Sequence, residues 1–133
     1  MPYNVTLKLI APRTTLQLTQ PWSDVKSLKV RSFLYTTANT GGQYMLMQVT
    51  GWDTNSYFQD PSTNSFVPYT KMILMPPTTA TVTRYVDVFS SYFDVIRTVP
   101  ASFSNIEISL LINGVINNDI SSSNPVFVEL YCE

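Results

Sequence analysis

Two alternating runs in the last third of the chain constrain the fold more than any other feature. Both runs lie between residues 105 and 133. A period of two places successive side chains on opposite faces of an extended strand, so each run predicts a strand with one buried face. Two strands cannot bury such rows by themselves, so the rest of the chain must supply a facing sheet. The apolar residues of the two rows are Ile106, Ile108, Leu110, Ile112, Val126, Val128, Leu130 and Cys132.

The connection between these strands carries turn signals. Asn113-Gly114 suits a tight hairpin turn, because both central residues of such a turn need positive φ. A second loop signal follows in the Ser/Asn/Pro cluster at 121–125. The chain therefore reverses direction between its last two long strands.

Shorter alternating runs cover most of the remaining chain. Leu28 and Val30 share one parity, whereas Phe33 and Tyr35 share the other, which predicts a β-bulge near Arg31-Ser32. We predict breaks at 11–13 and 20–24 and polar loops at 36–42 and 100–105. The longest predicted loop is 53–65, and Pro68 marks a sheet edge or a later strand start. The predicted strands are 3–10, 14–18, 25–35, 43–52, 66–75, 79–89 and 92–99.

This pattern predicts one all-β domain, 1–133: an antiparallel two-sheet sandwich, specifically a single jelly roll of about eight strands. An immunoglobulin-like sandwich fits less well, because the Cys…Trp…Cys spacing is absent. Three residues leave alternatives open. Trp22 either plugs the end of the core or is an exposed binding aromatic. Cys132 is either a small buried hydrophobe or a reactive or bridging thiol, and Arg84, in an apolar row, either pairs with an acid or marks a bend.

The composition argues against most catalytic classes. The sequence has no His and one Cys, so a Ser-His-Asp triad, a Cys-His pair and a Cys/His zinc site cannot be assembled. Carboxylates remain for acid–base chemistry, with Asp53 near Asp60 and Asp87 near Asp94. A calcium site from Asp53, Asn55 and Asp60 is an alternative, although the acids are few and the glycine pivot is missing. We expect no enzymatic activity, no metal and no cofactor.

The charge pattern argues against polyanionic partners. Charged residues make up 13% of the sequence, the formal net charge is -1, and the eight cations are scattered. Nucleic-acid binding therefore has little support. No apolar run approaches the roughly 20 residues of a membrane helix. The pattern of a signal peptide does not precede the first strand, so we expect either synthesis in the host cytoplasm without a cleaved signal or a leader that was removed.

A ligand site is predicted at the loop that begins at residue 52. Trp52 and Tyr57 offer aromatic rings, and Asp53 and Asn55 offer hydrogen-bonding groups for the hydroxyls of a sugar. The same pattern also fits an aromatic that folds back onto the edge of the core. These four residues support a carbohydrate- or receptor-binding β-sandwich as an alternative function.

The tail from Ile106 to Glu133 resembles the closing strands of single jelly-roll virion proteins, such as minor capsid and penton proteins of double-stranded DNA viruses. The resemblance covers about 28 residues and is a pattern without a signature motif. It implies a structural role in which copies meet side by side, with other capsid proteins as partners. Our expectation is a non-enzymatic, homo-oligomeric minor capsid or vertex protein located in the virion.

Overall fold

The computed structural model describes residues 2–35, 43–52, 56–60, 65–75, 83–86, 92–112 and 115–133. All regular structure in these ranges is extended, as the alternating runs predict. None of the described residues forms a helix that could cross a membrane. The strands are β1 (Tyr3–Leu9), β2 (Arg13–Tyr35), β3 (Gln43–Val49), β4 (Tyr57–Asp60), β5 (Ser65–Pro68), β6 (Lys71–Met75), β7 (Thr83–Val86), β8 (Val95–Ile112), β9 (Val115–Ile116) and β10 (Val126–Cys132).

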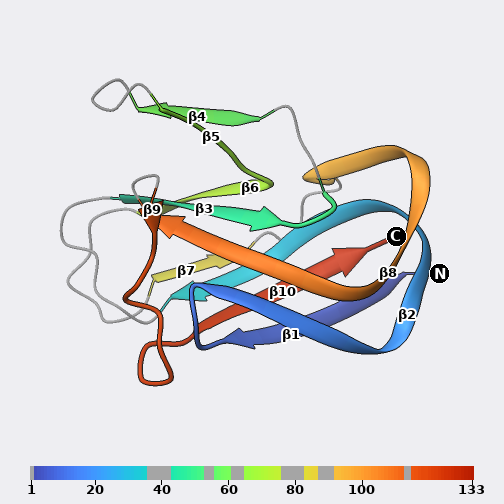
Figure 1. Cartoon of the computed structure of the whole chain (residues 1–133), viewed down its shortest axis with the longest axis horizontal. Coiled ribbons are helices and arrows are strands. Elements are labelled where there is room, and N and C mark those ends of the chain that lie inside the picture. Colours follow the sequence, from blue (N-terminus) through green and yellow to red (C-terminus); the bar gives the residue numbers. More distant parts are fainter. Residues whose placement is uncertain are drawn as a thin grey trace.

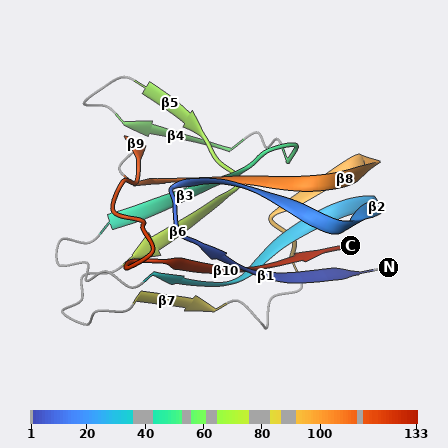
Figure 2. The ribbon, with the colours of Figure 1, turned by 60° about the horizontal axis from the view of Figure 1, so that its bottom comes forward.

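Eight of the strands form one antiparallel sheet with the order β1-β10-β2-β8-β3-β6, in which β7 also pairs with β2 and β9 with β8. The sheet bends over on itself, so that β8 and β3 lie opposite β10, β1 and β7 (Figures 1 and 2). The antiparallel all-β prediction is confirmed. The two layers, however, belong to one hydrogen-bonded sheet, and the second sheet is the small pair β4-β5. The jelly-roll topology stays a prediction.

Two long strands carry the sheet from one layer to the other. β2 pairs with β8 from Arg13 to Leu28, and three register shifts interrupt this pairing where both strands curve. Asp24 lies in the curve with a φ of 53°, a value that few non-glycine residues adopt. The predicted breaks at 20–24 and 100–105 are wrong as strand ends, because β2 and β8 run through these regions; at 20–24 the register shifts and the φ of Asp24 mark a bend within β2.

The strands of the tail lie where the alternation requires. β10 is paired on both sides, with β1 and with β2. Its inward row is at most 1% exposed and consists of Val126, Val128, Leu130 and Cys132. In the pairing with β2, Ser32 faces Glu129 and Val30 faces Leu130, so Arg31 is the extra residue of the predicted bulge.

Cys132 is the last residue of this buried row and has the environment of a small buried hydrophobe. The side chain is 1% exposed and belongs to the core. Burial raises the pKa of its thiol to about 12, so almost none of it is thiolate near neutral pH. Trp22 is half-buried, packs against the core and stacks on Tyr3, with 5.1 Å between ring centroids, as the end-of-core interpretation predicts. The side chain of Arg84 lies outside the described residues.

The region predicted as the longest loop is partly a hairpin. Tyr57 pairs with Pro68 and Gln59 with Phe66, whereas residues 53–55 and 61–64 lie outside the described residues. The predicted strand 66–75 is divided: β5 ends at Pro68, and β6 starts at Lys71, close to the later strand start that Pro68 suggested. The hairpin lies over the outer side of the β8-β3 layer (Figures 1 and 2). There the rings of Phe58 and Tyr44 contact each other, with 4.2 Å between centroids.

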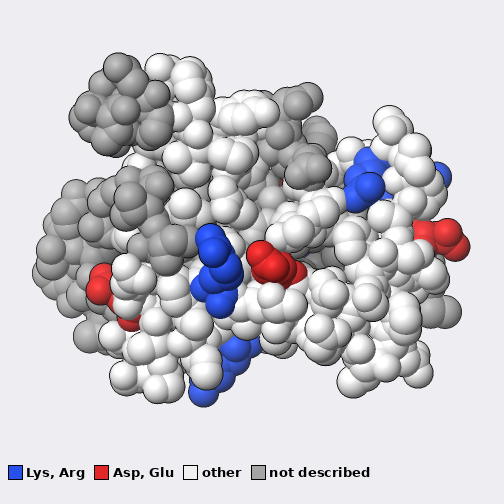
Figure 3. All heavy atoms as spheres, viewed as in Figure 1, with Lys and Arg blue, Asp and Glu red and all other residues white. Residues whose placement is uncertain are grey.

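Charged side chains are sparse on the surface, and several are paired. Lys71 binds Asp94 at 2.8 Å, and Arg31 lies 3.7 Å from Glu129. Figure 3 shows one face of the molecule on which a few separate charged side chains lie among uncharged ones. The low charge of the sequence is therefore also a property of that surface.

Candidate functional site

The predicted ligand site falls partly within the described structure. Trp52 and Tyr57 both line a pocket of about 600 Å³. Asp53 and Asn55 lie outside the described residues, as does the side chain of Asp60. The structure thus brings together two of the four predicted site residues.

Trp52 belongs to the core and is 3% exposed. Its ring stacks on that of Phe103, with 5.3 Å between centroids, and the guanidinium carbon of Arg97 lies 5.7 Å from the Trp52 ring centroid. Arg97 also donates a hydrogen bond to the carbonyl of Gly51. Trp52 therefore folds back onto the core, which is the second of the two interpretations of its sequence pattern, and Phe103 covers its ring.

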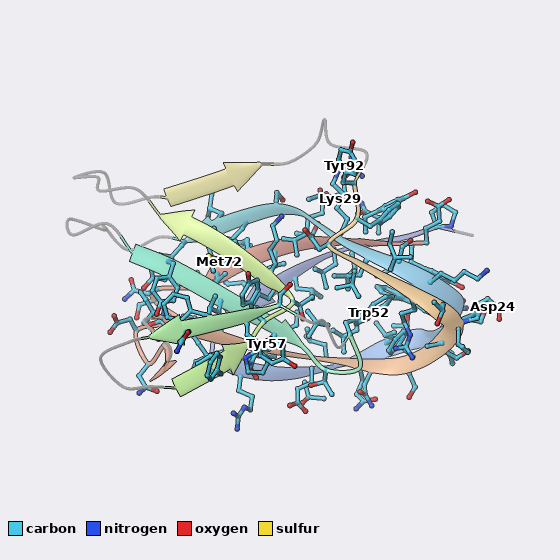
Figure 4. All side chains as sticks on the ribbon, turned by 90° about the horizontal axis from the view of Figure 1, so that it is seen from above. Asp24, Lys29, Trp52, Tyr57, Met72 and Tyr92 are labelled. Atoms are coloured by element: carbon cyan, nitrogen blue, oxygen red, sulfur yellow. The ribbon has the colours of Figure 1, made fainter. Side chains whose placement is uncertain are left out.

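Tyr57 has the opposite environment. It begins β4 and its side chain is 56% exposed. Figure 4 shows Tyr57 on the small sheet and Trp52 farther along, toward the bend of the long strands. An exposed ring that lines a pocket can stack on the apolar face of a ligand. Tyr57 is therefore an exposed aromatic ring of this pocket.

The floor of the pocket comes from strands that the sequence did not link to the site. Arg13 on β2 and Ser109 and Glu107 on β8 all line the pocket. Arg13 lies opposite Ser109, and its Nε donates a hydrogen bond to the Ser109 Oγ at 3.3 Å. Thr15 lies opposite Glu107 and donates to its Oε2 at 3.4 Å. The alternation of the sequence shows that these side chains lie on the outer face of their strands. It does not show that β2 pairs with β8, because more than 90 residues separate the paired positions.

A polar framework holds the hairpin against this floor. Gln48 on β3 donates from Nε2 to the carbonyl of Pro68 at 2.7 Å. The hydroxyl of Thr70 accepts a hydrogen bond from the Val49 N–H at 3.0 Å and donates to the carbonyl of Trp52 at 3.3 Å. Since Thr70 is buried, these bonds satisfy a hydroxyl that burial would otherwise penalise. The wall and floor of the pocket are therefore fixed relative to each other.

Acid–base or metal chemistry gains no support from the described carboxylates. Asp94 uses one oxygen for Lys71 at 2.8 Å and the other for the Val30 N–H at 2.7 Å. It thus connects β6, β2 and the start of β8. Within the ranges that the structure describes, no three His, Cys, Asp or Glu residues gather as metal ligands. Asp87, and the Asp53–Asp60 pair with the calcium site suggested there, are outside the described side chains.

A second surface of interest lies along one side of the bent sheet, and we call it the open edge. β1 pairs with β10 on one side, and residues 13–17 of β2 pair with β8 on one side. Among the described residues no strand pairs with their other sides. Within the described ranges, seven half-buried hydrophobic residues pack against the core, and three of them belong to these two stretches: Tyr3, Val5 and Leu16. Leu18 and Trp22 follow on β2, are half-buried as well, and are counted with the open edge.

Comparisons with known proteins identify no family for this chain. No family model and no curated protein matches the sequence. Among solved structures, the chain is similar to the core of Drosophila NLP, a structure described as giving insight into pentamer formation and histone binding. The match covers 99% of this chain and 96% of that one, with 10% sequence identity and a TM-score of 0.39. At this level the likeness bears on neither function nor assembly.

Proposed function

We propose that this protein is a non-enzymatic structural protein of a virion, of the minor capsid or vertex type, that self-associates through low-charge β surfaces. The single observation that carries the proposal is the open edge. There, five apolar side chains are half-buried, although Leu7 and Leu9 of β1 are buried, and the strand edges beside them are unpaired among the described residues. A second copy of the chain is the partner that would bury these five side chains and pair with these strand edges.

An unpaired strand edge exposes a monomeric protein to unwanted pairing with other chains. An unpaired edge presents N–H and C=O groups that another strand can bind, and monomeric proteins protect such edges with charges, prolines or bulges. Within β1, Lys8 is the single charged residue, and no proline interrupts the strand. The weak protection of this edge supports pairing with another chain.

The sequence of β1 is compatible with pairing to a copy of itself. In an antiparallel pair centred on Thr6, Val5 would face Leu7 and Asn4 would face Lys8. Side chains of the same parity would then share a face, and no like charges would lie opposite each other. A two-fold contact of this kind uses the same surface on both copies, as most homo-oligomers do.

The viral and topological parts of the proposal have their own support. The tail that resembles jelly-roll virion proteins forms the end of β8, β9 and β10, and its inward rows are buried at Ile106, Ile108, Leu110 and throughout β10. Long strands that pass from one layer to the other are compatible with a single jelly roll. The absence of His from the sequence supports a role without catalysis.

Light scattering coupled to size-exclusion chromatography tests self-association. We expect a mass above one chain at micromolar concentration, and a shift toward the monomer in Leu18→Lys, which places a charge on the open edge. Gln17→Lys is the matched control, because it adds the same charge to the exposed, opposite face of the same strand and should keep the oligomer.

Circular dichroism confirms that each variant folds, and Leu16→Lys replaces Leu18→Lys if the latter does not. A wild-type protein that stays monomeric at high micromolar concentration would overturn the self-association. If particles purified from the virus lack the protein, the virion assignment is wrong.

A further inference from the structure

We propose that the pocket between the β4-β5 hairpin and the large sheet binds an uncharged, hydroxyl-rich ligand, namely a saccharide residue of a glycan. The proposal rests on observations of its own, from the outer side of the sheet and the hairpin, although Arg13 of the pocket also lies in the open edge. Its volume of about 600 Å³ falls in the range of small-molecule sites in proteins.

The floor offers hydrogen-bond donors and acceptors next to each other. Arg13 uses its Nε on Ser109, and the terminal N–H groups of its guanidinium are further donors. Glu107 uses Oε2 to accept from Thr15, and Oε1 is a further acceptor. Because Arg13 faces Ser109 and Glu107 is two positions away on β8, a donor and an acceptor lie diagonally across two paired strands. Neighbouring hydroxyls of a sugar match such a pair.

The charges of the floor favour a neutral ligand. Among the described residues, the charged ones that line the pocket are Arg13 and Glu107, and their charges are opposite. An anionic ligand in the pocket would be repelled by the carboxylate of Glu107, and a cationic ligand would be repelled by the guanidinium of Arg13. A hydroxyl group can both donate and accept, so an uncharged polyol can satisfy both side chains at once.

The wall supplies an apolar contact of the right kind. Tyr57 is an exposed ring on the rim, and Pro68 lies opposite it in the hairpin and also lines the pocket. The C–H face of a sugar ring packs on an aromatic ring while its hydroxyls bind polar groups on the other side. Trp52 does not serve this purpose, since its ring is buried against Phe103. The structure therefore assigns stacking to Tyr57 and hydrogen bonding to Arg13 and Glu107.

The test is a printed glycan array of neutral, sialylated and sulfated glycans, followed by titration of the best neutral glycan by isothermal calorimetry. We expect binding to neutral glycans that weakens about tenfold or more in Tyr57→Ala, as the loss of a stacking contact predicts. Phe66→Ala is the matched control. Phe66 is an exposed aromatic on the same hairpin, at 64%, but does not line the pocket, so its removal should leave the affinity unchanged.

Glu107→Gln provides an independent readout, because it keeps the shape of the side chain and changes an acceptor. We expect weaker binding of the neutral glycan with an unchanged melting temperature. The proposal is overturned by an array without neutral binders, by equal losses in Tyr57→Ala and Phe66→Ala, or by binding to anionic glycans alone. Light scattering on the same samples reports the oligomer separately, so failure here leaves the self-association proposal standing.

Discussion

β10 and the first half of β2 have the same sequence pattern but opposite environments. In β10 the inward row is buried at every position, because β1 and β2 flank the strand on both sides. In β2 the inward residues Thr14, Leu16 and Leu18 are half-buried, since β8 flanks the strand on one side. Alternation therefore defines the face of a strand, whereas burial in these two strands follows their lateral neighbours; in the edge strand β1, Leu7 and Leu9 are buried nonetheless. The comparison directs attention to the open edge as a place where a neighbour is missing.

Truncating one leucine in each strand gives the largest expected difference. Leu130→Ala in β10 should lower the free energy of unfolding by about 3 kcal/mol, because it removes a fully buried side chain and leaves a cavity. Leu18→Ala should cost about 1 kcal/mol in dilute protein, where its side chain is already partly in water. Urea denaturation followed by fluorescence measures both. Equal losses would show that the open edge is as well buried as β10.

The buried thiol of Cys132 in β10 should give a smaller effect, a dependence of stability on pH, which tests how completely β10 is buried. Burial raises the pKa of its thiol from 9.0 to about 12, so the folded state holds a proton that the unfolded chain releases earlier. The stability that this proton contributes is complete below pH 9 and is lost as the pH rises toward 12. Relative to Cys132→Val, which has no titrating thiol, the wild type should lose stability in that window.

Thiol alkylation checks the environment of Cys132 directly. Iodoacetamide at pH 8 should react slowly with the folded protein and fully in urea, because burial hinders access and keeps the thiol protonated. Rapid reaction in the folded state, together with parallel pH profiles for the wild type and Cys132→Val, would place Cys132 at the surface.

The features that sequence analysis predicted are those that depend on near neighbours in the chain. The parity change between Val30 and Phe33 predicted the bulge, which lies at Arg31. The alternation of the tail predicted the last part of β8 and β10, and Pro68 suggested the later strand start that β6 has at Lys71. Each of these signals is local, because a side chain's face is determined by its position along its own strand.

The features that could not be predicted depend on which strands meet. β2 continues through 20–24 because β8 pairs with it and bends with it, and this pairing joins residues far apart in the sequence. The hairpin β4-β5 has four residues in each strand, too few for alternation to be recognised. Contacts between distant strands also explain why the sequence indicated Trp52 and Tyr57 as equivalent rings. Phe103, on β8, stacks on Trp52 and helps to bury it.

Hydrogen–deuterium exchange at two protein concentrations tests most directly whether the open edge is an interface between copies. If it is, amides of β1 and of residues 13–18 in β2 should exchange more slowly at high micromolar than at nanomolar concentration. Amides of β10, which are already paired on both sides, should not change. Exchange at the open edge that is independent of concentration in a protein shown to be oligomeric would contradict the account.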